Sequence, residues 1–426
     1  MYITRVEIKN VRIIESLDWQ IEEGREAGWH VFLGDNGSGK SSFLKAVALG
    51  LIGPKYSYEL RQNWASWLRD RQDHGSVHLT TRFEIQRKKA PGEIDLQVAF
   101  PSPCRFGVVF SRDEEQVGLE TEEQPTEGFL GYKYLNRNKD YFAASYGPFR
   151  RFSQSNKENS ARDTRVRPHL SLFDDSFALI DSLAWLQELQ FKKLEGDNAG
   201  ATLLDHIIAF INEEAFLPNS VTLTEVSSEG VFFQDGNGNK VTVDNLSDGF
   251  RSMLSLTLDL FFQLAKKYGG NNLFVTDHRR VDCPGVVLID EIDAHLHPTW
   301  QRRVGHWFTK HFPNIQFLVT THSPLICQAA EHGSVWVWPR PGSGETPSRM
   351  TGVALQRLLY GDLREAMSTD VFGQDLSYSE SSKKMQDQLA WLNQKELEEG
   401  LTVEEEKERG RLRAVFPTRQ NIRGRL

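Results

Sequence analysis

The stretch Gly34-Asp-Asn-Gly-Ser-Gly-Lys40-Ser41 decides how this chain folds, because it fills every position of the pattern G-x-x-x-x-G-K-[ST]. The glycines of this pattern let backbone N–H groups converge on an anion, its lysine reaches the β- and γ-phosphates, and its last hydroxyl ligates Mg²⁺. An apolar segment at 31–33 predicts a strand before the loop, and residues 41–51 are apolar at helical spacing and stop at Gly53-Pro54. A strand, a glycine-rich loop and a helix predict a nucleotide-binding site, whereas a simple turn that contains a lysine needs no such flanks. The residues expected to contact the nucleotide are Asn36, Gly37, Ser38, Gly39, Lys40, Ser41 and Ser42.

A second buried strand ends in two acids. Val286-Val-Leu-Ile is followed directly by Asp290 and Glu291. Ligands of open α/β sheets bind at the carboxyl ends of parallel strands, so both carboxylates are expected beside the phosphate loop. Asp290 is predicted to hold Mg²⁺ together with Ser41, and Glu291 to act as the catalytic group that polarises the attacking water. Two solvated acids at a strand end would be a sufficient explanation only in the absence of the phosphate loop.

Two shorter motifs complete an ordered set. Leu246-Ser247-Asp248-Gly249 opens an expected helix, and Thr320-Thr-His322-Ser323 follows an expected strand. Ser247 and the Gly249 N–H are suited to a γ-phosphate, yet the first site can be built without them. A capped core helix is the alternative for the former motif, and a structural histidine is the alternative for the latter.

These four motifs, in this order, resemble those of the ABC-type ATPase superfamily, in which the signature motif of one subunit completes the site of the other. The resemblance implies that Ser247 and Gly249 are signature residues, although Asp248 stands where family signatures often carry glycine. It implies that His322 is the switch histidine, which contacts the γ-phosphate and joins Glu291 among the catalytic residues.

The same resemblance assigns three further residues. Asn10 and Arg12 match a family position near the nucleotide, and a surface turn is the equal alternative. Gln154 is assigned as the glutamine-loop ligand of Mg²⁺. His295-Leu-His297 suggests a metal pair, but with no third ligand at hand we interpret it as the loop that lines the dimer interface in this family.

Two longer segments, 290–301 and 312–324, narrow the resemblance to the RecF/SMC-like and OLD-like ATPases. Within them, the chain is most similar to stand-alone bacterial ATPases of anti-phage defence, of the Septu PtuA type, which also occur with some retrons. The resemblance covers about residues 1–340. OLD-type proteins continue into a Toprim nuclease, which needs an Asp-x-Asp pair, and no such pair follows His322. A nuclease is therefore expected on a separate subunit, and a transporter ATPase is disfavoured by the long spacing between the first motifs.

The expected fold class is α/β, an ABC-type P-loop ATPase head with a mixed sheet, a helical insertion and a helical C-terminal region. We predict a first head lobe over 1–110, an insertion and helical arm over 111–215, and a second head lobe over 216–345. Within the arm, residues 171–195 have helical spacing. Residues 346–426 are expected to form a helical docking or oligomerisation region, for which a plain solvated helical hairpin is the default alternative.

The composition of the chain indicates the cellular compartment in which the protein is expected. Hydrophobic residues make up 39% of the 426, so a sizeable core can be buried. Cys104, Cys283 and Cys327 have no paired spacing, which predicts a reducing compartment without disulfides or a zinc site. The N-terminus alternates like a strand rather than a signal peptide, and no run approaches the ~18 apolar residues of a membrane span. We expect a soluble, cytoplasmic protein with no membrane partner.

Nucleic acid is a possible partner. A net charge of -8 argues against a uniformly nucleic-acid-coating protein. Local basic residues with interleaved aromatic residues nevertheless suggest a contact, and scattered charge with core aromatics is the equal alternative. The basic residues are Lys133, Arg137, Lys139, Arg150, Arg151, Arg162, Arg165 and Arg167, and the aromatic residues are Tyr132, Tyr134, Tyr141 and Phe142.

The motifs and the resemblance together predict an ATPase that uses ATP and Mg²⁺. It is expected to dimerise head-to-head around ATP, as a homodimer or a higher even oligomer, and to control a separate nuclease or effector in anti-phage defence. One alternative is a nucleotide-sensing scaffold with little turnover that restrains a toxic partner. Another is a DNA-repair clamp of the RecF/SMC type.

Overall fold

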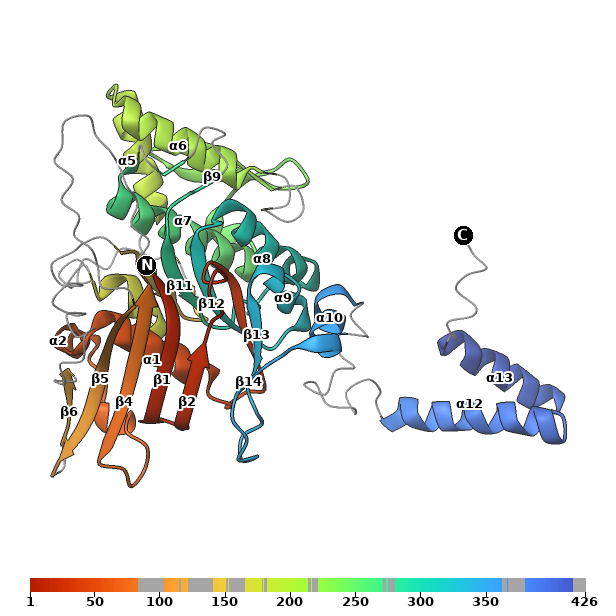
Figure 1. Cartoon of the computed structure of the whole chain (residues 1–426). Helices are drawn as coiled ribbons and strands as arrows, with labels where there is room; N and C mark the ends of the chain where they lie inside the picture. The colour runs from red at the N-terminus through yellow and green to blue at the C-terminus, as the bar shows by residue number, and fades with distance from the viewer. Residues whose placement is uncertain are drawn as a thin grey trace. The chain divides into compact units, whose positions relative to one another are not determined.

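The protein forms two compact units, Met1–Tyr360 and Gly361–Leu426, in the computed structural model (Figure 1). The structure describes residues 1–82, 103–114, 116–121, 141–150, 152, 165–177, 179, 182–213, 216, 221–270, 273–274, 280–361, 366 and 380–416. The first unit is a mixed α/β head and the described part of the second unit is helical, so the predicted fold class is confirmed. The division falls after Tyr360 rather than after residue 345, because the intervening segment adds a strand to the head sheet.

Within the described residues, the central sheet has six strands in the order β14-β13-β3-β12-β11-β7. Their bounds are β3 (Gly28–Leu33), β7 (Ala143–Tyr146), β11 (Gly285–Ile289), β12 (Ile315–Thr321), β13 (Ser334–Val337) and β14 (Ser348–Arg349). All neighbours pair in parallel except β13 and β14. Every residue of β11 and β12 is buried, as expected of parallel strands that are covered on both faces. The carboxyl ends of β3, β11 and β12 therefore meet at one edge, where the sequence motifs begin.

A second, antiparallel sheet has the strand order β2-β1-β4-β5-β6. Its strands are β1 (Tyr2–Val11), β2 (Ile14–Gln20), β4 (His74–Arg82), β5 (Cys104–Asp113) and β6 (Gln116–Thr121). Its buried face shares one hydrophobic core with helix α1 (Lys40–Ile52) and with residues of the central sheet. Phe43 of α1, for example, lies 4.7 Å from Phe32 of β3 and 5.9 Å from Trp19 of β2, centroid to centroid. The helix that follows the phosphate loop is thus held between both sheets.

The two sheets are also joined by a buried amide. The Gln316 side chain of β12 donates from Nε2 to the Ile3 carbonyl and accepts at Oε1 from the Ile3 N–H, both at 2.8 Å. Gln316 is fully buried, so both backbone groups of Ile3 find their partners in one side chain rather than in water. This pair fixes the start of β1 against the strand that contains Thr320 and precedes His322.

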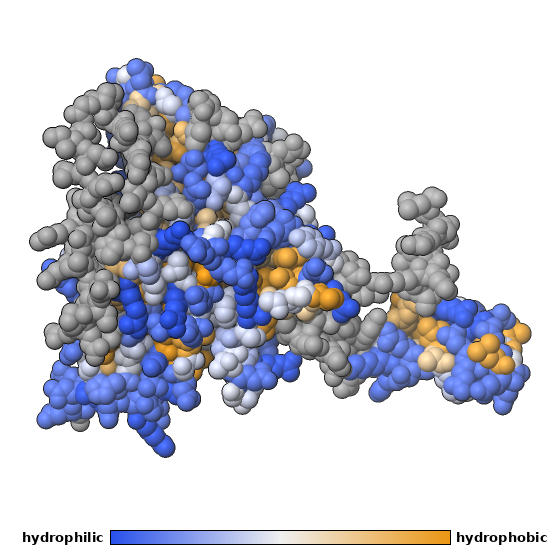
Figure 2. Space-filling model, in the orientation of Figure 1, coloured by the Kyte–Doolittle hydropathy of each residue, from blue (hydrophilic) through white to orange (hydrophobic). Residues whose placement is uncertain are grey.

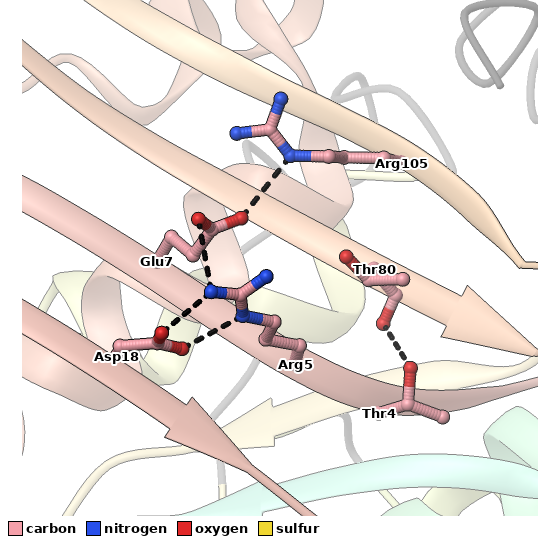
Figure 3. A network of polar contacts seen from close by, with 6 residues as sticks. All are labelled: Thr4, Arg5, Glu7, Asp18, Thr80 and Arg105. Carbon is pink, nitrogen blue, oxygen red and sulfur yellow. Dashed lines mark hydrogen bonds and ion pairs between the residues drawn. The ribbon is translucent and has the colours of Figure 1, made fainter. Parts of the chain in front are cut away.

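The outer face of the antiparallel sheet carries a charge-balanced network (Figure 3). Arg5 donates to both carboxylate oxygens of Asp18, at 2.8 and 2.5 Å, and lies 3.4 Å from Glu7. Arg105 of the neighbouring β5 donates to the other oxygen of Glu7 at 3.1 Å. The hydrogen bonds from Arg5 hold the pKa of Asp18 below its ordinary value. These two arginines are matched by two carboxylates, so their charge is already compensated within the sheet.

A helical arm and a small sheet pack together in the same unit. The arm contains α5 (Ser182–Leu194), α6 (Asn198–Ile211) and α7 (Asp248–Tyr268), and the sheet contains β8 (Thr222–Ser227), β9 (Gly230–Gln234) and β10 (Lys240–Thr242). Helix α7 begins where the sequence placed it. Other helices in the described part of this unit are α2 (Pro54–Ser57), α4 (Leu170–Phe173), α8 (Pro298–His311), α9 (Pro324–Cys327) and α10 (Gly352–Tyr360). Short 3₁₀ turns lie at Tyr58–Leu60, Trp64–Ser66, Arg167–His169, Val243–Asn245 and Ala330–His332.

The predicted insertion contributes more to the sheets of the head than its polar composition suggests. Within 111–215, β6 extends the antiparallel sheet and β7 pairs with β11 in the central sheet. The expected helix over 171–195 is split into α4 and α5. Asp174 accepts hydrogen bonds from the N–H and hydroxyl of Ser176, at 2.9 and 2.5 Å, and this local turn follows the end of α4.

The second unit contains α12 (Glu380–Glu398) and α13 (Val403–Val415), which pack as a hairpin. Thr402 and Glu405 form a reciprocal capping box at the start of α13. Among the described residues of both units, no helix is long and apolar enough to cross a membrane. All three cysteines are buried.

Candidate nucleotide-binding site

The phosphate loop connects β3 to α1, and its glycines meet two different demands. Gly37 and Gly39 have φ values of 76° and 105°, in the left-handed region that side chains disfavour. At Gly34, a Cβ would lie 2.8 Å from the Trp338 Cβ and 2.9 Å from the Trp338 carbonyl oxygen. Two glycines therefore serve the loop's backbone shape, and the third lets β3 end against the segment that follows β13.

Lys40 places its ammonium inside this loop. Its Nζ donates to the carbonyls of Gly34 and Asp35, both at 2.8 Å, and lies 3.4 Å from the Ser38 hydroxyl. Burial lowers the Lys40 pKa, while the nearby Asp290 and Glu291 oppose that shift. Since an ammonium has three donors, these carbonyl contacts hold it where phosphate oxygens can accept the same hydrogen atoms.

Ser41 and Asp290 meet although 249 residues separate them. The Ser41 hydroxyl donates to Asp290 Oδ1 at 3.0 Å, and the Thr320 hydroxyl donates to the same oxygen at 2.5 Å. Asp290 is 3% exposed. One hydroxyl and one carboxylate suit Mg²⁺, which keeps most of its waters and takes further oxygens from a phosphate. The residues present therefore fit the metal that the sequence implied.

Glu291 occupies an unusual backbone conformation. Its φ is 47°, a left-handed value that is uncommon for a residue with a long side chain. Its N–H donates to the Thr320 hydroxyl at 2.8 Å, so Thr320 contacts both acids. Strained residues of this kind persist where their surroundings fix them, and they gather at functional sites.

Arg150 is a further site residue, and its role differs from the one predicted for it. Its Nη2 donates to the carbonyls of Asp290 and Glu291 at 3.0 and 2.6 Å, and its Nε donates to the Gly147 carbonyl at 2.9 Å. Burial lowers the Arg150 pKa to about 10, against the opposing charges of Asp290, Asp293 and Glu291. With 2% of its surface exposed, Arg150 is enclosed in the protein, which contradicts the prediction of a nucleic-acid contact here.

The other residues of that predicted contact divide into two groups. Phe142 is buried, and Tyr141 is half-buried with its pKa raised by burial to about 12. Arg165 lies over the Tyr56 ring at 4.7 Å, and Arg167 is half-buried. These aromatic groups belong to the core, as the alternative interpretation had it. The positions outside the described residues are Lys133, Arg137, Lys139, Arg151, Arg162, Tyr132, Tyr134 and the predicted metal ligand Gln154.

His322 follows β12 at the same sheet edge as the acids. Its N–H lies 3.4 Å from Asp293 Oδ2, and the hydroxyl of the preceding Thr321 donates to Asp293 Oδ1 at 2.6 Å. The 293–296 turn is thereby attached to the segment that carries His322. His297 caps α8 by accepting from the Thr299 N–H at 3.3 Å, so this histidine has a structural role.

The predicted signature residues stand at the start of α7 in different surroundings. Ser247 is exposed at the N-cap position, and its side chain makes no capping hydrogen bond. Gly249 is buried, and a Cβ there would lie 2.3 Å from the His295 carbonyl oxygen. Gly249 is thus required by the packing of its own chain, whereas Ser247 faces outward.

A cavity of about 470 Å³ lies between this helix start and the segment that carries Arg150. Its lining includes Phe149 and Arg150 on one side and Asp248, Arg251 and His295 on the other. The side chains of Asp248 and Arg251 form an ion pair there. One cavity thus brings together the first turn of α7, the 293–296 turn and the arginine that binds the carbonyls of both acids.

Asn10 lies near the end of β1 and Arg12 lies in the turn between β1 and β2, with φ values of 52° and 54°. The Asn10 amide donates to Gln72 Oε1 and to the His74 carbonyl, both at 3.2 Å, and the Arg12 guanidinium lies 5.2 Å from the centroid of the Trp67 ring. The side chain of Ile13 lies 3.0 Å from the point where a Cβ on Gly39 would stand. The turn therefore lies against the phosphate loop, while the two predicted side chains contact neighbouring protein groups.

Comparisons with known proteins agree with this arrangement. Residues 30–328 match the family described as "AAA domain, putative AbiEii toxin, Type IV TA system". The Septu protein PtuA of Bacillus mycoides (strain KBAB4) is 26% identical over 339 residues, which cover 79% of this chain and 40% of that protein. The Retron Ec83 probable ATPase of Escherichia coli is 25% identical over 408 residues, which cover 82% and 74%. The predicted resemblance to Septu-type ATPases is confirmed.

The solved structures to which the chain is similar are more distant. An SMC head bound to the C-winged helix domain of ScpA has a TM-score of 0.48 and 14% identity, and the match covers 82% of this chain and 98% of that one. The SMC head domain from Thermotoga maritima has a TM-score of 0.42 and 12% identity over 83% of this chain and 100% of that one.

The contacts of Arg150 lead to a testable expectation about the predicted metal ligand Asp290 and the predicted catalytic residue Glu291. Lysine cannot reproduce a planar fork that donates to three carbonyls, so Arg150→Lys should let Asp290 and Glu291 shift. We expect kcat for ATP hydrolysis to fall roughly tenfold or more, because small displacements of catalytic groups are costly, while KM changes little. Arg112→Lys is the matched control, since Arg112 is half-buried and also donates to a backbone carbonyl, that of Gln72. Equal kcat values for the two variants would contradict this role.

Proposed function

Because the chain belongs to the family of AAA domains described as putative AbiEii toxins of a type IV toxin–antitoxin system, we propose that it binds ATP with Mg²⁺ and hydrolyses it to ADP and phosphate. The observation that carries this proposal is the convergence of Lys40, Ser41, Asp290 and Glu291 at one edge of the central sheet. These residues supply a positively charged donor, a pair of metal ligands and a candidate base at one helix N-terminus. Phosphoryl transfer to water uses these groups.

Each residue has a separate task in this proposal. Lys40 and the amides of the loop bind the β- and γ-phosphates, and Ser41 and Asp290 hold Mg²⁺, which neutralises charge on the phosphates. Glu291 accepts a proton from the attacking water, or polarises that water, from a backbone position that Thr320 and Arg150 fix. His322 approaches the γ-phosphate from the end of β12. Arg12 and Asn10 support the loop from the neighbouring turn.

The site is proposed to be completed by a second copy of the chain. Ser247 is exposed at the start of a 21-residue helix, whose N-terminus favours an anion. Gly249 has a packing role within its own subunit and leaves the first turn of α7 close to the 293–296 turn. In a head-to-head dimer, this turn of one subunit would contact the γ-phosphate bound by the other.

The cellular role proposed here is in anti-phage defence, with control of a separate nuclease or effector subunit. Its support is the likeness to proteins named Septu protein PtuA and Retron Ec83 probable ATPase. Hydrolysis in the dimer would then time the release or activation of that partner. A scaffold with little turnover is the competing function, and Glu291 favours turnover because such a scaffold needs no catalytic carboxylate.

The first prediction concerns the hydrolytic step. Glu291→Gln should keep ATP binding but slow single-turnover hydrolysis roughly a hundredfold or more, since an amide is a poor proton acceptor. The variant should also accumulate as an ATP-bound dimer, visible by sedimentation. Glu331→Gln, a change at an exposed glutamate of the same unit, is the control and should behave like wild type. Hydrolysis by Glu291→Gln at the wild-type rate would remove Glu291 from the mechanism.

The second prediction concerns the composite site. Lys40→Ala removes one phosphate donor, and Ser247→Arg blocks the helix start without placing a side chain at tightly packed Gly249. Each variant alone should be inactive. A mixture should regain activity, because each mixed dimer has one site with an intact Lys40 and an intact Ser247.

The control for this mixture is a chain that carries both substitutions, mixed with Lys40→Ala chains. Such dimers lack an intact loop and should stay inactive. The model of sites shared between subunits would be wrong if confirmed Lys40→Ala/Ser247→Arg heterodimers showed no hydrolysis above this control.

A further inference from the structure

The hairpin of α12 and α13 buries very little apolar surface. Within residues 380–416, the buried apolar side chains are Leu392 at 2% exposure and Leu412 at 0%. The rest of the seam includes ion pairs, Lys395 with Glu405 at 2.5 Å and Arg409 with Glu396. A helix as short as the 13-residue α13 is marginal in water unless packing supports it, and a core of two leucines supplies little packing. The hairpin therefore needs a further surface against which to pack.

Apolar side chains that could form this surface are exposed on the hairpin. The exposed fractions are 54% for Trp391, 87% for Leu397, 87% for Val403 and 54% for Val415. Figure 2 shows hydrophobic surface on this unit among hydrophilic side chains. Leu397 and Val403 flank the turn between the helices, whereas Val415 ends α13 at the opposite, open end. Hydrophobic groups are thus available near both ends of the hairpin.

The hairpin is also polarised in charge along its length. Residues 390–406, which surround the turn, contain six glutamates and one lysine. Residues 380–389 and 407–416, which form the open half, contain six basic residues and three acidic ones. Because the two helices run antiparallel, the acidic half of each lies beside the acidic half of the other, and likewise for the basic halves. The hairpin as a whole has an acidic turn end and a basic open end.

We propose that this hairpin binds the hairpin of a second copy of the chain in an antiparallel arrangement. The acidic turn end of each would then lie against the basic open end of the other, and the exposed apolar side chains would be covered between them. An isologous two-fold contact of this kind uses each complementary pair twice. A parallel arrangement would instead place like charges together at both ends. Self-complementary charge is the reason that we commit to a second copy rather than to another protein.

This contact is separate from the proposed ATP-dependent dimer. None of the charged residues of the hairpin belongs to the nucleotide site, so the association should not need ATP. A chain with two different two-fold interfaces can build assemblies larger than a dimer, because each interface leaves the other available. The inference therefore stands or falls independently of the proposed hydrolysis.

The test is charge exchange in the full chain, without nucleotide and with Lys40→Ala to suppress association of the heads. One variant reverses the turn end with Glu398→Lys, Glu399→Lys, Glu404→Lys and Glu406→Lys. The other reverses the open end with Lys383→Glu, Lys384→Glu, Lys407→Glu and Arg411→Glu. Glu396 and Glu405 are left unchanged because they pair with Arg409 and Lys395 inside the hairpin. Circular dichroism should confirm that helix content is kept.

Sedimentation equilibrium should find that the parent chain dimerises, and that each charge-reversed variant alone dimerises at least about tenfold more weakly. An equimolar mixture of the two variants should restore the parent affinity, because ends of opposite charge again face each other. The control reverses four exposed charges on the head, with Asp70→Lys, Glu229→Lys, Glu331→Lys and Glu345→Lys, and should leave dimerisation unchanged. A monomeric parent, reversed variants that dimerise as the parent does, or a mixture that fails to associate would overturn the proposal.

Discussion

The carboxylate of Asp290 accepts hydrogen bonds from Ser41 and Thr320, and the rest of the site depends on this meeting of three chain segments. Each segment stands at the carboxyl end of a parallel strand, β3, β11 or β12, so their meeting requires the strand order of the central sheet. The Gln316 bridge and the α1 core then fix that sheet against the antiparallel one. The architecture of the head thus positions the hydroxyls of Ser41 and Thr320 beside the acids Asp290 and Glu291.

Much of this could be predicted from the sequence, because the features concerned are local. The phosphate loop, the strand that ends in Asp290 and Glu291, and the start of α7 each carry their own pattern of glycine, apolar and acidic residues. Other features depend on contacts between distant segments. Arg150 lies in a polar stretch and its partners are backbone carbonyls, which have no sequence signature. The strand Ala143–Tyr146 is short and poor in β-branched residues, so only its pairing with β11 identifies it.

Two roles assigned by resemblance take on a different physical meaning in the structure. Gly249 is explained by the closeness of the His295 carbonyl within its own chain, so glycine at this position does not by itself indicate a ligand. Ser247 is better evidence for a ligand contact, because it is exposed and its side chain makes no capping hydrogen bond. Asn10 likewise has partners in Gln72 and His74, which supports the turn rather than a direct nucleotide contact. Packing and ligand binding can favour the same residue type.

The central claim is that the Lys40 ammonium, held among the carbonyls of its own loop, binds the phosphates of ATP. Titration calorimetry of ATP in the presence of Mg²⁺, with wild type and Lys40→Ala, tests this most directly. A charge-assisted hydrogen bond contributes about 1.5–3 kcal/mol, so the account predicts an affinity roughly tenfold to a hundredfold weaker in the variant. Equal affinities for the two proteins, with both shown to be folded, would contradict it.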